Sequence, residues 1–194
     1  MTRRDRARGK ARKRWDVIID YVPKDRPIVG AEVGVWNGKT TCRILPALPK
    51  LILCAVDAWQ PAKPGDSYYE SGAHDAYWTP EQFSEEYALY RKRTERWRDR
   101  IIEMRGDFEE MAQKVDDESL DFVFLDADHS ESGTFRALWA WYPKVAQGGF
   151  LFMHDLGETS KFEGPEKAAK RYFGEQFAMG KYEANHTWVL RRSR

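Results

Sequence analysis

The segment Leu120–Ser130 has the sequence L-D-F-V-F-L-D-A-D-H-S, a short apolar run followed at once by Asp126, Asp128 and His129. Apolar runs of this length are typical of strands buried on both faces, as in parallel sheets covered by helices. Ligands bind to such sheets beyond the carboxyl ends of the strands. This order, a strand first and titratable side chains directly after it, predicts an α/β fold with a functional site at the end of the strand.

The same order recurs along the chain, where apolar runs alternate with segments in which apolar residues have helical spacing. The pattern predicts strands at residues 28–35, 51–56, 101–104, 120–125, 150–153, 177–182 and 186–191, with the turn Gly148-Gly149 leading into the fifth. We therefore expect a Rossmann-like, seven-stranded, mostly parallel sheet with helices on both faces and the last strand antiparallel.

Polar residues follow each of the first five expected strands. The turn from Glu32 to Thr40 contains Gly34 and Gly38, which let the backbone approach a ligand closely. It is neither a dinucleotide G-x-G-x-x-G fingerprint nor a Walker-type loop, which favours a small carboxylate over a pyrophosphate. Each polar residue alone has an ordinary explanation as a turn, a helix cap or a solvated acid, but five groups at successive strand ends indicate one ligand site. The other groups are Asp57, Gly106-Asp107-Phe108, Asp126–His129 and His154-Asp155.

The composition predicts one domain with a charged N-terminal arm. No apolar run is long enough to span a membrane, so we expect no membrane partner. Residues 1–14 carry eight Lys and Arg side chains, which defines a basic arm that either binds nucleic acid or is a solvated terminus, and residues 15–194 form the domain. Cys42 and Cys54 match neither a metal site nor a redox pair, which indicates a reduced, cytoplasmic setting. Residues 60–99 are expected to form a lid-like insertion and a helix, and the lid aromatics are Tyr68, Tyr69, Tyr77 and Trp78.

Four motifs together resemble a known family. They are the D-A-D-H-S of Asp126–Ser130, the aromatic-proline sequence Trp141-Tyr142-Pro143, Gly148-Gly149 and His154-Asp155. From about residue 28 to Arg191, the chain resembles class I S-adenosylmethionine-dependent methyltransferases, above all a branch similar to sugar or macrolide and catechol-type O-methyltransferases.

The resemblance implies S-adenosyl-L-methionine as the cofactor, with Thr40 at its carboxylate, Asp57 at its ribose, and Asp107 with Phe108 at its adenine. The full set of implied cofactor-binding residues is Glu32, Gly34, Trp36, Asn37, Gly38, Thr40, Asp57, Trp59, Gly106, Asp107, Phe108 and Asp126.

The resemblance also implies catalytic and metal-binding residues. In similar catechol and caffeoyl-coenzyme A O-methyltransferases, an acid after the fourth strand and an Asp-Asn pair after the fifth bind Mg²⁺, and a lysine three residues after that first acid is the general base. The corresponding metal residues here are Asp126, His154 and Asp155, and His129 takes the place of the lysine. Because Mg²⁺ prefers oxygen ligands and His154 offers nitrogen, the sequence leaves open whether Mg²⁺, another divalent cation or no metal binds. We expect His129, with an ordinary pKa of about 6.5, to take the acceptor's proton, with Asp126 and Asp128 completing the catalytic group.

The sequence thus predicts methyl transfer to a hydroxyl of a small-molecule acceptor. One alternative is a nucleic-acid methyltransferase that uses the basic arm, although the N-P-P-Y-type tetrad of amino-methylating enzymes is missing. Another is a non-catalytic protein that binds S-adenosylmethionine, against which the acids at all strand ends argue. A homo-oligomer is neither required nor excluded.

Overall fold

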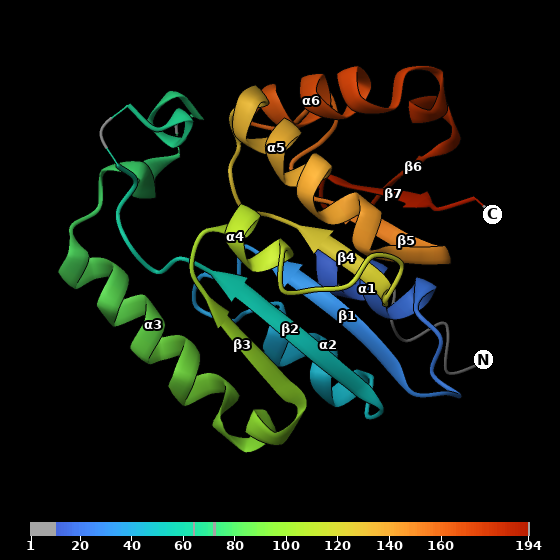
Figure 1. Ribbon diagram of the computed structural model, residues 1–194, viewed down its shortest axis with the longest axis horizontal. Coiled ribbons are helices and arrows are strands. Elements are labelled where there is room, and N and C mark those ends of the chain that lie inside the picture. The colour runs from blue at the N-terminus through green and yellow to red at the C-terminus, as the bar shows by residue number, and fades with distance from the viewer. Residues whose placement is uncertain (1–10, 64, 72, 194) are drawn as a thin grey trace.

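The computed structural model describes residues 11–63, 65–71 and 73–193. Its seven strands form one sheet in the order β3-β2-β1-β4-β5-β7-β6 (Figure 1). All neighbouring pairs are parallel except those of β7, which runs antiparallel to both β5 and β6. The expected fold class is confirmed. The strands are β1 (Ile28–Val33), β2 (Leu51–Asp57), β3 (Ile101–Arg105), β4 (Leu120–Leu125), β5 (Val145–Met153), β6 (Lys181–Glu183) and β7 (Thr187–Arg191).

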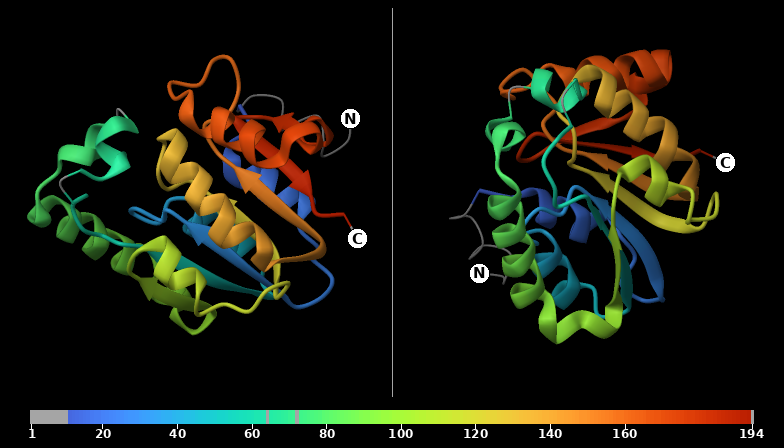
Figure 2. Two further views of the ribbon diagram at one scale, coloured as in Figure 1. Left: turned by 45° about the horizontal axis from the view of Figure 1, so that its top comes forward. Right: turned by 60° about the vertical axis from the view of Figure 1, so that its left-hand side comes forward.

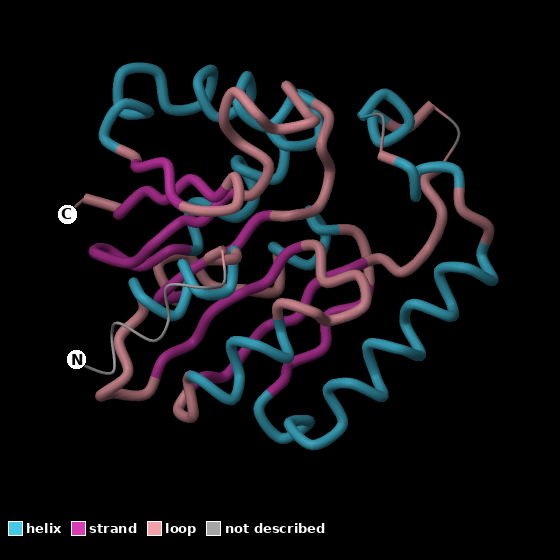
Figure 3. Tube along the Cα trace, turned by 180° about the vertical axis from the view of Figure 1, so that it is seen from behind, coloured by secondary structure: helices cyan, strands magenta, loops and turns pink. Residues whose placement is uncertain are grey.

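Helices cover both faces of this sheet (Figure 1 and Figure 3). One face carries α1 (Arg14–Tyr21), α2 (Thr41–Ala47) and α3 (Pro80–Thr94). The other face carries α4 (Phe108–Ala112), α5 (Glu131–Trp141) and α6 (Gly164–Phe173). Short 3₁₀ segments lie at η2 (Ser67–Ser71), η3 (His74–Tyr77), η4 (Glu95–Arg100), η5 (Tyr142–Lys144) and η6 (Gly174–Met179).

The central strand β4 shows why its sequence is almost continuously apolar. Phe122 and Phe124 pack into the core under α1 and α2, whereas Val123 and Leu125 pack into the core under α4, α5 and α6. All four side chains are at most 5% exposed. Since successive side chains of a strand point to opposite faces, burial on both faces requires an apolar residue at nearly every position.

The strand register brings the chemically active residues to one edge of the sheet. Val33 of β1 lies beside Leu125 of β4, which lies beside Met153 of β5. The residues that follow these three continue the ladder, because the Asp126 N–H donates to the Val33 carbonyl at 2.8 Å and the His154 N–H to the Leu125 carbonyl at 3.0 Å. The sheet's topology reverses between β1 and β4, the place where parallel sheets bind ligands.

Two local predictions were wrong. Gly148 and Gly149 do not precede the fifth strand but lie inside β5, where the register with β4 shifts between Leu120 and Phe122, so the pair accommodates an irregularity and not a turn. The segment 177–182 is 3₁₀ helix up to Met179 and strand only from Lys181.

The N-terminal helix begins at Arg14, so this residue, assigned to the basic arm, belongs to the folded domain. Residues 1–10 lie outside the described part of the chain. No helix within the described ranges combines the length and apolar character needed to cross a membrane.

Candidate active site

A pocket of about 650 Å³ lies at the carboxyl ends of the central strands. Its volume is typical of small-molecule sites, which measure roughly 300–1,000 Å³. Figure 2 shows the segment that carries η2 and η3 opposite α5 and α6, on the side toward which the strands point. The predicted site residues that line the pocket are Gly34, Trp36, Asp57, Trp59, Gly106, Asp107, Phe108, Asp126, Asp128, His129 and Asp155.

The turn after β1 is held in a strained conformation against the end of β4. Gly34 has φ +92°, and a Cβ there would lie 2.2 Å from the Asp126 carbonyl oxygen, so only glycine fits. Trp36 and Trp59 also have positive φ, 51° and 44°. Their N–H groups both donate to the Asp57 carboxylate at 2.8 Å. Non-glycine residues in this backbone region cluster at functional sites.

Asp57 therefore anchors the pocket wall as well as facing the pocket. Burial raises the pKa of Asp57, while the hydrogen bonds that its carboxylate accepts from backbone N–H groups lower it. The Trp59 ring is only 2% exposed, stacks on Tyr90 at 4.8 Å, and donates its Nε1–H to the Trp36 carbonyl at 2.6 Å. A carboxylate has about four acceptor positions, so Asp57 keeps capacity for a ligand hydroxyl.

Four of the residues implied for cofactor binding do not line the pocket. Glu32 is 2% exposed and accepts the Thr41 hydroxyl at 2.6 Å, and burial raises the pKa of Glu32 to about 8. The Asn37 side-chain oxygen accepts a hydrogen bond from Arg93 Nη1 at 2.7 Å. The other two are Gly38, where a Cβ would lie 2.9 Å from the Tyr90 ring, and Thr40, which is 1% exposed. These side chains hold the turn and α2 in place.

Asp107 and Phe108, at the end of β3, form the far end of the pocket. The Asp107 carboxylate caps α4, since its Oδ1 accepts the N–H groups of Glu109 at 2.8 Å and Glu110 at 3.3 Å. The Phe108 carbonyl accepts the Trp141 Nε1–H at 3.0 Å. Both residues therefore have a structural role in addition to their place in the pocket wall.

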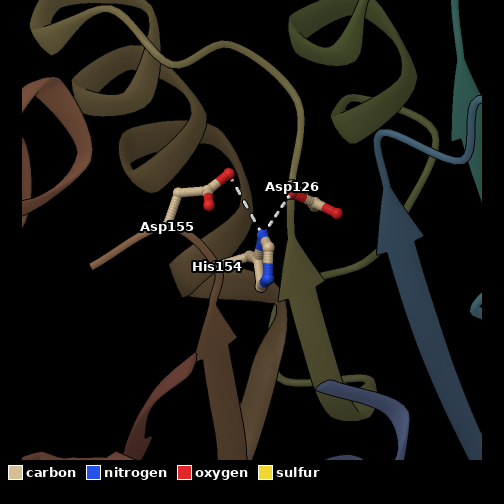
Figure 4. A group of neighbouring side chains, drawn as sticks. All are labelled: Asp126, His154 and Asp155. Carbon is tan, nitrogen blue, oxygen red and sulfur yellow. Dashed lines mark ion pairs between the residues drawn. The ribbon is translucent and has the colours of Figure 1, made fainter. Parts of the chain in front are cut away.

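Two histidines and two aspartates form one cluster at the ends of β4 and β5, shown in part in Figure 4. His154 Nδ1 lies 3.1 Å from Asp126 Oδ1 and 3.1 Å from Asp155 Oδ2. His129 Nε2 lies 2.8 Å from Asp155 Oδ2 and 3.8 Å from Asp126 Oδ1. Asp155 has φ 61°, a third strained non-glycine residue in the pocket wall.

The carboxylates determine the protonation of these imidazoles. Burial by itself lowers the pKa of His129, but the hydrogen bonds and charges of Asp126 and Asp155 outweigh it and raise the pKa to about 10. The same balance raises the pKa of His154 to about 9. With no cation at these carboxylates, the two aspartates thus favour the protonated form of the His129 imidazole at neutral pH.

The donor set also fits a divalent cation. Among the described residues, Asp126, His154 and Asp155 offer ligand atoms that all lie within 4.8 Å of one another. Two ligand atoms at right angles around a cation, each about 2.1 Å away from it, are about 3.0 Å apart. The two separations of 3.1 Å at His154 Nδ1 match this spacing. One nitrogen and two oxygens suit Mn²⁺ or Zn²⁺ at least as well as Mg²⁺.

Asp128, expected to be catalytic, is hydrogen-bonded to the segment that was expected to form a lid. Its Oδ2 accepts the Ser67 hydroxyl at 2.9 Å, and its Oδ1 accepts the Ser130 N–H at 2.8 Å. Gly133 leaves room for this carboxylate, since a Cβ would lie 1.7 Å from its Oδ2. The link joins η2 to the start of α5 across the pocket.

One side of the pocket is aromatic. The His129 ring stacks on Phe162 at 4.2 Å, and both line the pocket with Tyr68 of the expected lid. Trp78 packs on Trp36 at 6.1 Å without lining the pocket. Of the other expected lid aromatics, Tyr69 and Tyr77 contact each other with ring centroids 5.4 Å apart, and Tyr77 is 70% exposed.

Arg14 is a pocket residue that the sequence motifs did not identify. Its Nη1 lies 3.3 Å from Asp126 Oδ2, and its Nε donates to the Thr40 hydroxyl at 2.9 Å. Together with His129 and His154, the Arg14 charge holds the pKa of Asp126 well below its usual range, against the effect of burial. The only available signal was a basic residue at the start of a helix in a highly basic segment.

The pocket is acidic. Its described lining residues include eight carboxylates against four lysine and arginine side chains. Such a lining suits a cationic ligand and disfavours a polyphosphate or the phosphate backbone of a nucleic acid.

A family model described as a methyltransferase domain matches residues 31–156. Comparison with curated protein sequences finds no match. Among solved structures, the chain is similar to the O-methyltransferase NovP, with 20% identity, a TM-score of 0.61, and coverage of 92% of this chain and 76% of that one. The calicheamicin methyltransferase CalS11 is 16% identical with a TM-score of 0.65, and the match covers 91% of this chain and 76% of that one. An O-methyltransferase family protein from Burkholderia thailandensis is 12% identical with a TM-score of 0.62, over 92% of this chain and 55% of that one.

Proposed function

The chain belongs to the methyltransferase domain family, and from that premise we propose that it transfers a methyl group from S-adenosyl-L-methionine to a hydroxyl of a small molecule. One observation carries this proposal: Asp57, Asp107, Asp126 and Asp155, from the ends of four strands, converge on a single acidic pocket at the switch point of the sheet. S-adenosyl-L-methionine supplies a methyl group on a sulfonium, whose positive charge matches that lining.

The reaction is one in-line displacement. The acceptor oxygen forms a bond to the methyl carbon while the carbon–sulfur bond breaks, leaving S-adenosylhomocysteine, and the acceptor's proton passes to a base. Such a step needs alignment and exclusion of water more than further covalent chemistry. The strained turn at Trp36 and the lid attached through Ser67 and Asp128 serve alignment and enclosure.

The cofactor half of the pocket is the wall from the β1 turn to α4. Gly34 allows close approach of the backbone, Asp57 accepts the ribose hydroxyls, and Asp107 with Phe108 borders the adenine. Glu32, Asn37, Gly38 and Thr40 support this wall from behind.

The acceptor half is formed by His129, Phe162 and the lid. With the carboxylates of Asp126 and Asp155 engaged by a divalent cation, the His129 imidazole would lose the partners that hold its proton and could take one from the acceptor hydroxyl. Asp126, His154 and Asp155 would hold that cation, which would lower the acceptor's pKa. His129 is thereby the proposed base of the cation-bound protein.

The nucleic-acid alternative receives less support. Arg12 and Arg14, at the end of the basic arm, pair with acids of the domain itself, Asp20 and Glu183 in one case and Asp126 in the other. The acidic pocket would repel a phosphate backbone.

Incubation with S-adenosyl-L-methionine labelled in its methyl group and a panel of phenols, catechols and sugars tests this proposal. We expect label in an alkali-stable methyl ether, formed in proportion to S-adenosylhomocysteine. Label found instead in RNA or DNA, or transfer to amines alone, would contradict it.

A further inference from the structure

Arg14 is fixed at its backbone and directed into the pocket by its side chain. Its N–H donates to the Asn185 side chain at 3.2 Å, in the turn between β6 and β7. Its guanidinium lines the pocket beside the start of α2, where Nε donates to Thr40 at 2.9 Å. When the main chain and the Nε of an arginine are both held in place, the fork formed by its two terminal nitrogens, Nη1 and Nη2, points in a defined direction.

Much of that fork remains available. The separation of 3.3 Å between Nη1 and Asp126 Oδ2 is longer than the roughly 2.7–2.9 Å of a strong charge-assisted hydrogen bond. In the described part of the chain, Nη2 has no hydrogen-bond or ion-pair partner. A second acidic group can therefore bind to the fork without breaking the bond to Thr40.

The position of Arg14 in the pocket indicates what that acidic group is. Of the four lysine and arginine side chains that line the pocket, Lys63 belongs to the lid segment, Arg136 to α5 and Lys161 to the loop after β5. Arg14 alone adjoins the β1–α2 turn, through its bond to Thr40. The proposed function assigns the adenosine end to Asp107 and Phe108, which follow β3 and are separated from the β1–α2 turn by β2. A ligand bound there through its adenosine extends its amino-acid end toward Arg14.

Thr40 cannot take a carboxylate itself, because its side chain is 1% exposed and does not line the pocket. We propose that Arg14 binds the carboxylate of the methionine moiety of S-adenosyl-L-methionine, and that Thr40 positions the guanidinium. This inference rests on the proposed function. It also assigns a role to α1, which contributes a cofactor-binding residue from outside the segment matched by the family model, residues 31–156.

Calorimetry with two ligands tests the inference. S-adenosylhomocysteine carries the carboxylate, whereas S-adenosyl-3-thiopropylamine has the same adenosine, sulfur and ammonium and lacks only the carboxylate. Arg14→Ala should weaken binding of the first on the order of 10- to 100-fold, as expected for hydrogen bonds between charged groups, and leave the second nearly unchanged. Arg14→Lys should give an intermediate loss, because it keeps the charge without the fork.

Arg12→Ala is the matched control. Arg12 pairs with Asp20 at 2.7 Å and Glu183 at 3.2 Å, anchors the same segment, and does not line the pocket, so its loss should leave both affinities unchanged. Equal weakening of both ligands by Arg14→Ala would show a purely structural role and overturn the inference, as would no weakening of either. Failure of the unaltered protein to bind S-adenosylhomocysteine would instead overturn the proposed function beneath it.

Discussion

Glu32 is the first residue of the glycine-containing turn that was expected to bind the cofactor. In the structure its side chain is buried and accepts a hydrogen bond from the Thr41 hydroxyl. Burial raises its pKa from an ordinary value of 4.5 to about 8. The folded state therefore keeps this carboxyl protonated at neutral pH, whereas the unfolded chain ionises it. Its contribution to stability is fully present below pH 4.5 and is lost as the pH rises toward 8.

Glu32→Gln removes this titration while keeping an acceptor for the Thr41 hydroxyl. Between pH 5 and 8, the unfolding free energy of the unaltered protein should fall relative to that of the variant by up to about 1.4 kcal/mol per pH unit, the limit for one proton. Urea unfolding at four pH values measures the difference. Glu175→Gln, which alters an exposed carboxylate, is the control and should give no such divergence.

The variant should also bind S-adenosylhomocysteine with nearly unaltered affinity, because Glu32 does not line the pocket. Parallel pH profiles for the unaltered protein and Glu32→Gln would refute the assignment of a neutral, buried carboxyl. A tenfold loss of cofactor affinity would show that Glu32 acts as an ionised ligand instead.

Three further predictions concern the site and the arm. His129→Ala should lower turnover by roughly 10²- to 10⁴-fold, the usual effect of losing a positioned proton acceptor, with little change in cofactor affinity by calorimetry; near-full activity would place the base elsewhere. Asp155→Asn should weaken Mn²⁺ binding at least tenfold in a calorimetric titration, and asparagine tolerates the backbone φ of 61° at this position. A chelator should abolish turnover of the unaltered protein, whereas turnover that is indifferent to chelator would argue for a metal-free site. Removal of residues 1–10 should leave cofactor affinity unchanged, and a loss of salt-dependent RNA binding on that removal would support a nucleic-acid partner.

The strand ends could be predicted from sequence because burial on both faces leaves an unmistakable pattern. Asp57, Asp107, Asp126 and Asp155 each follow an apolar run, and parallel register alone brings them to one edge. The same logic could not separate residues that line the pocket from those behind it. Glu32 belongs to the second group because of its depth in the fold, which no spacing reveals.

Contacts between segments that are distant in the sequence could not be predicted from motifs and spacing. Arg14 reaches the pocket only because α1 docks against the β6–β7 turn through Asn185, a contact across 171 positions of the chain. The protonation of His129 depends in the same way on Asp155, which comes from a different strand. Motif position predicted that His129 faces the acceptor, but its pKa follows from neighbours that only the folded chain assembles.

Direct titration of the chain with S-adenosylhomocysteine and, separately, with NAD tests the central claim. An acidic pocket without a dinucleotide fingerprint should bind S-adenosylhomocysteine at one site per chain and give no heat with NAD. Asp57→Ala should weaken that binding, because charge-assisted hydrogen bonds to the ribose hydroxyls would be lost. Equal affinity for NAD, or no binding of S-adenosylhomocysteine by the folded protein, would contradict the assignment of this chain as an S-adenosylmethionine-dependent methyltransferase.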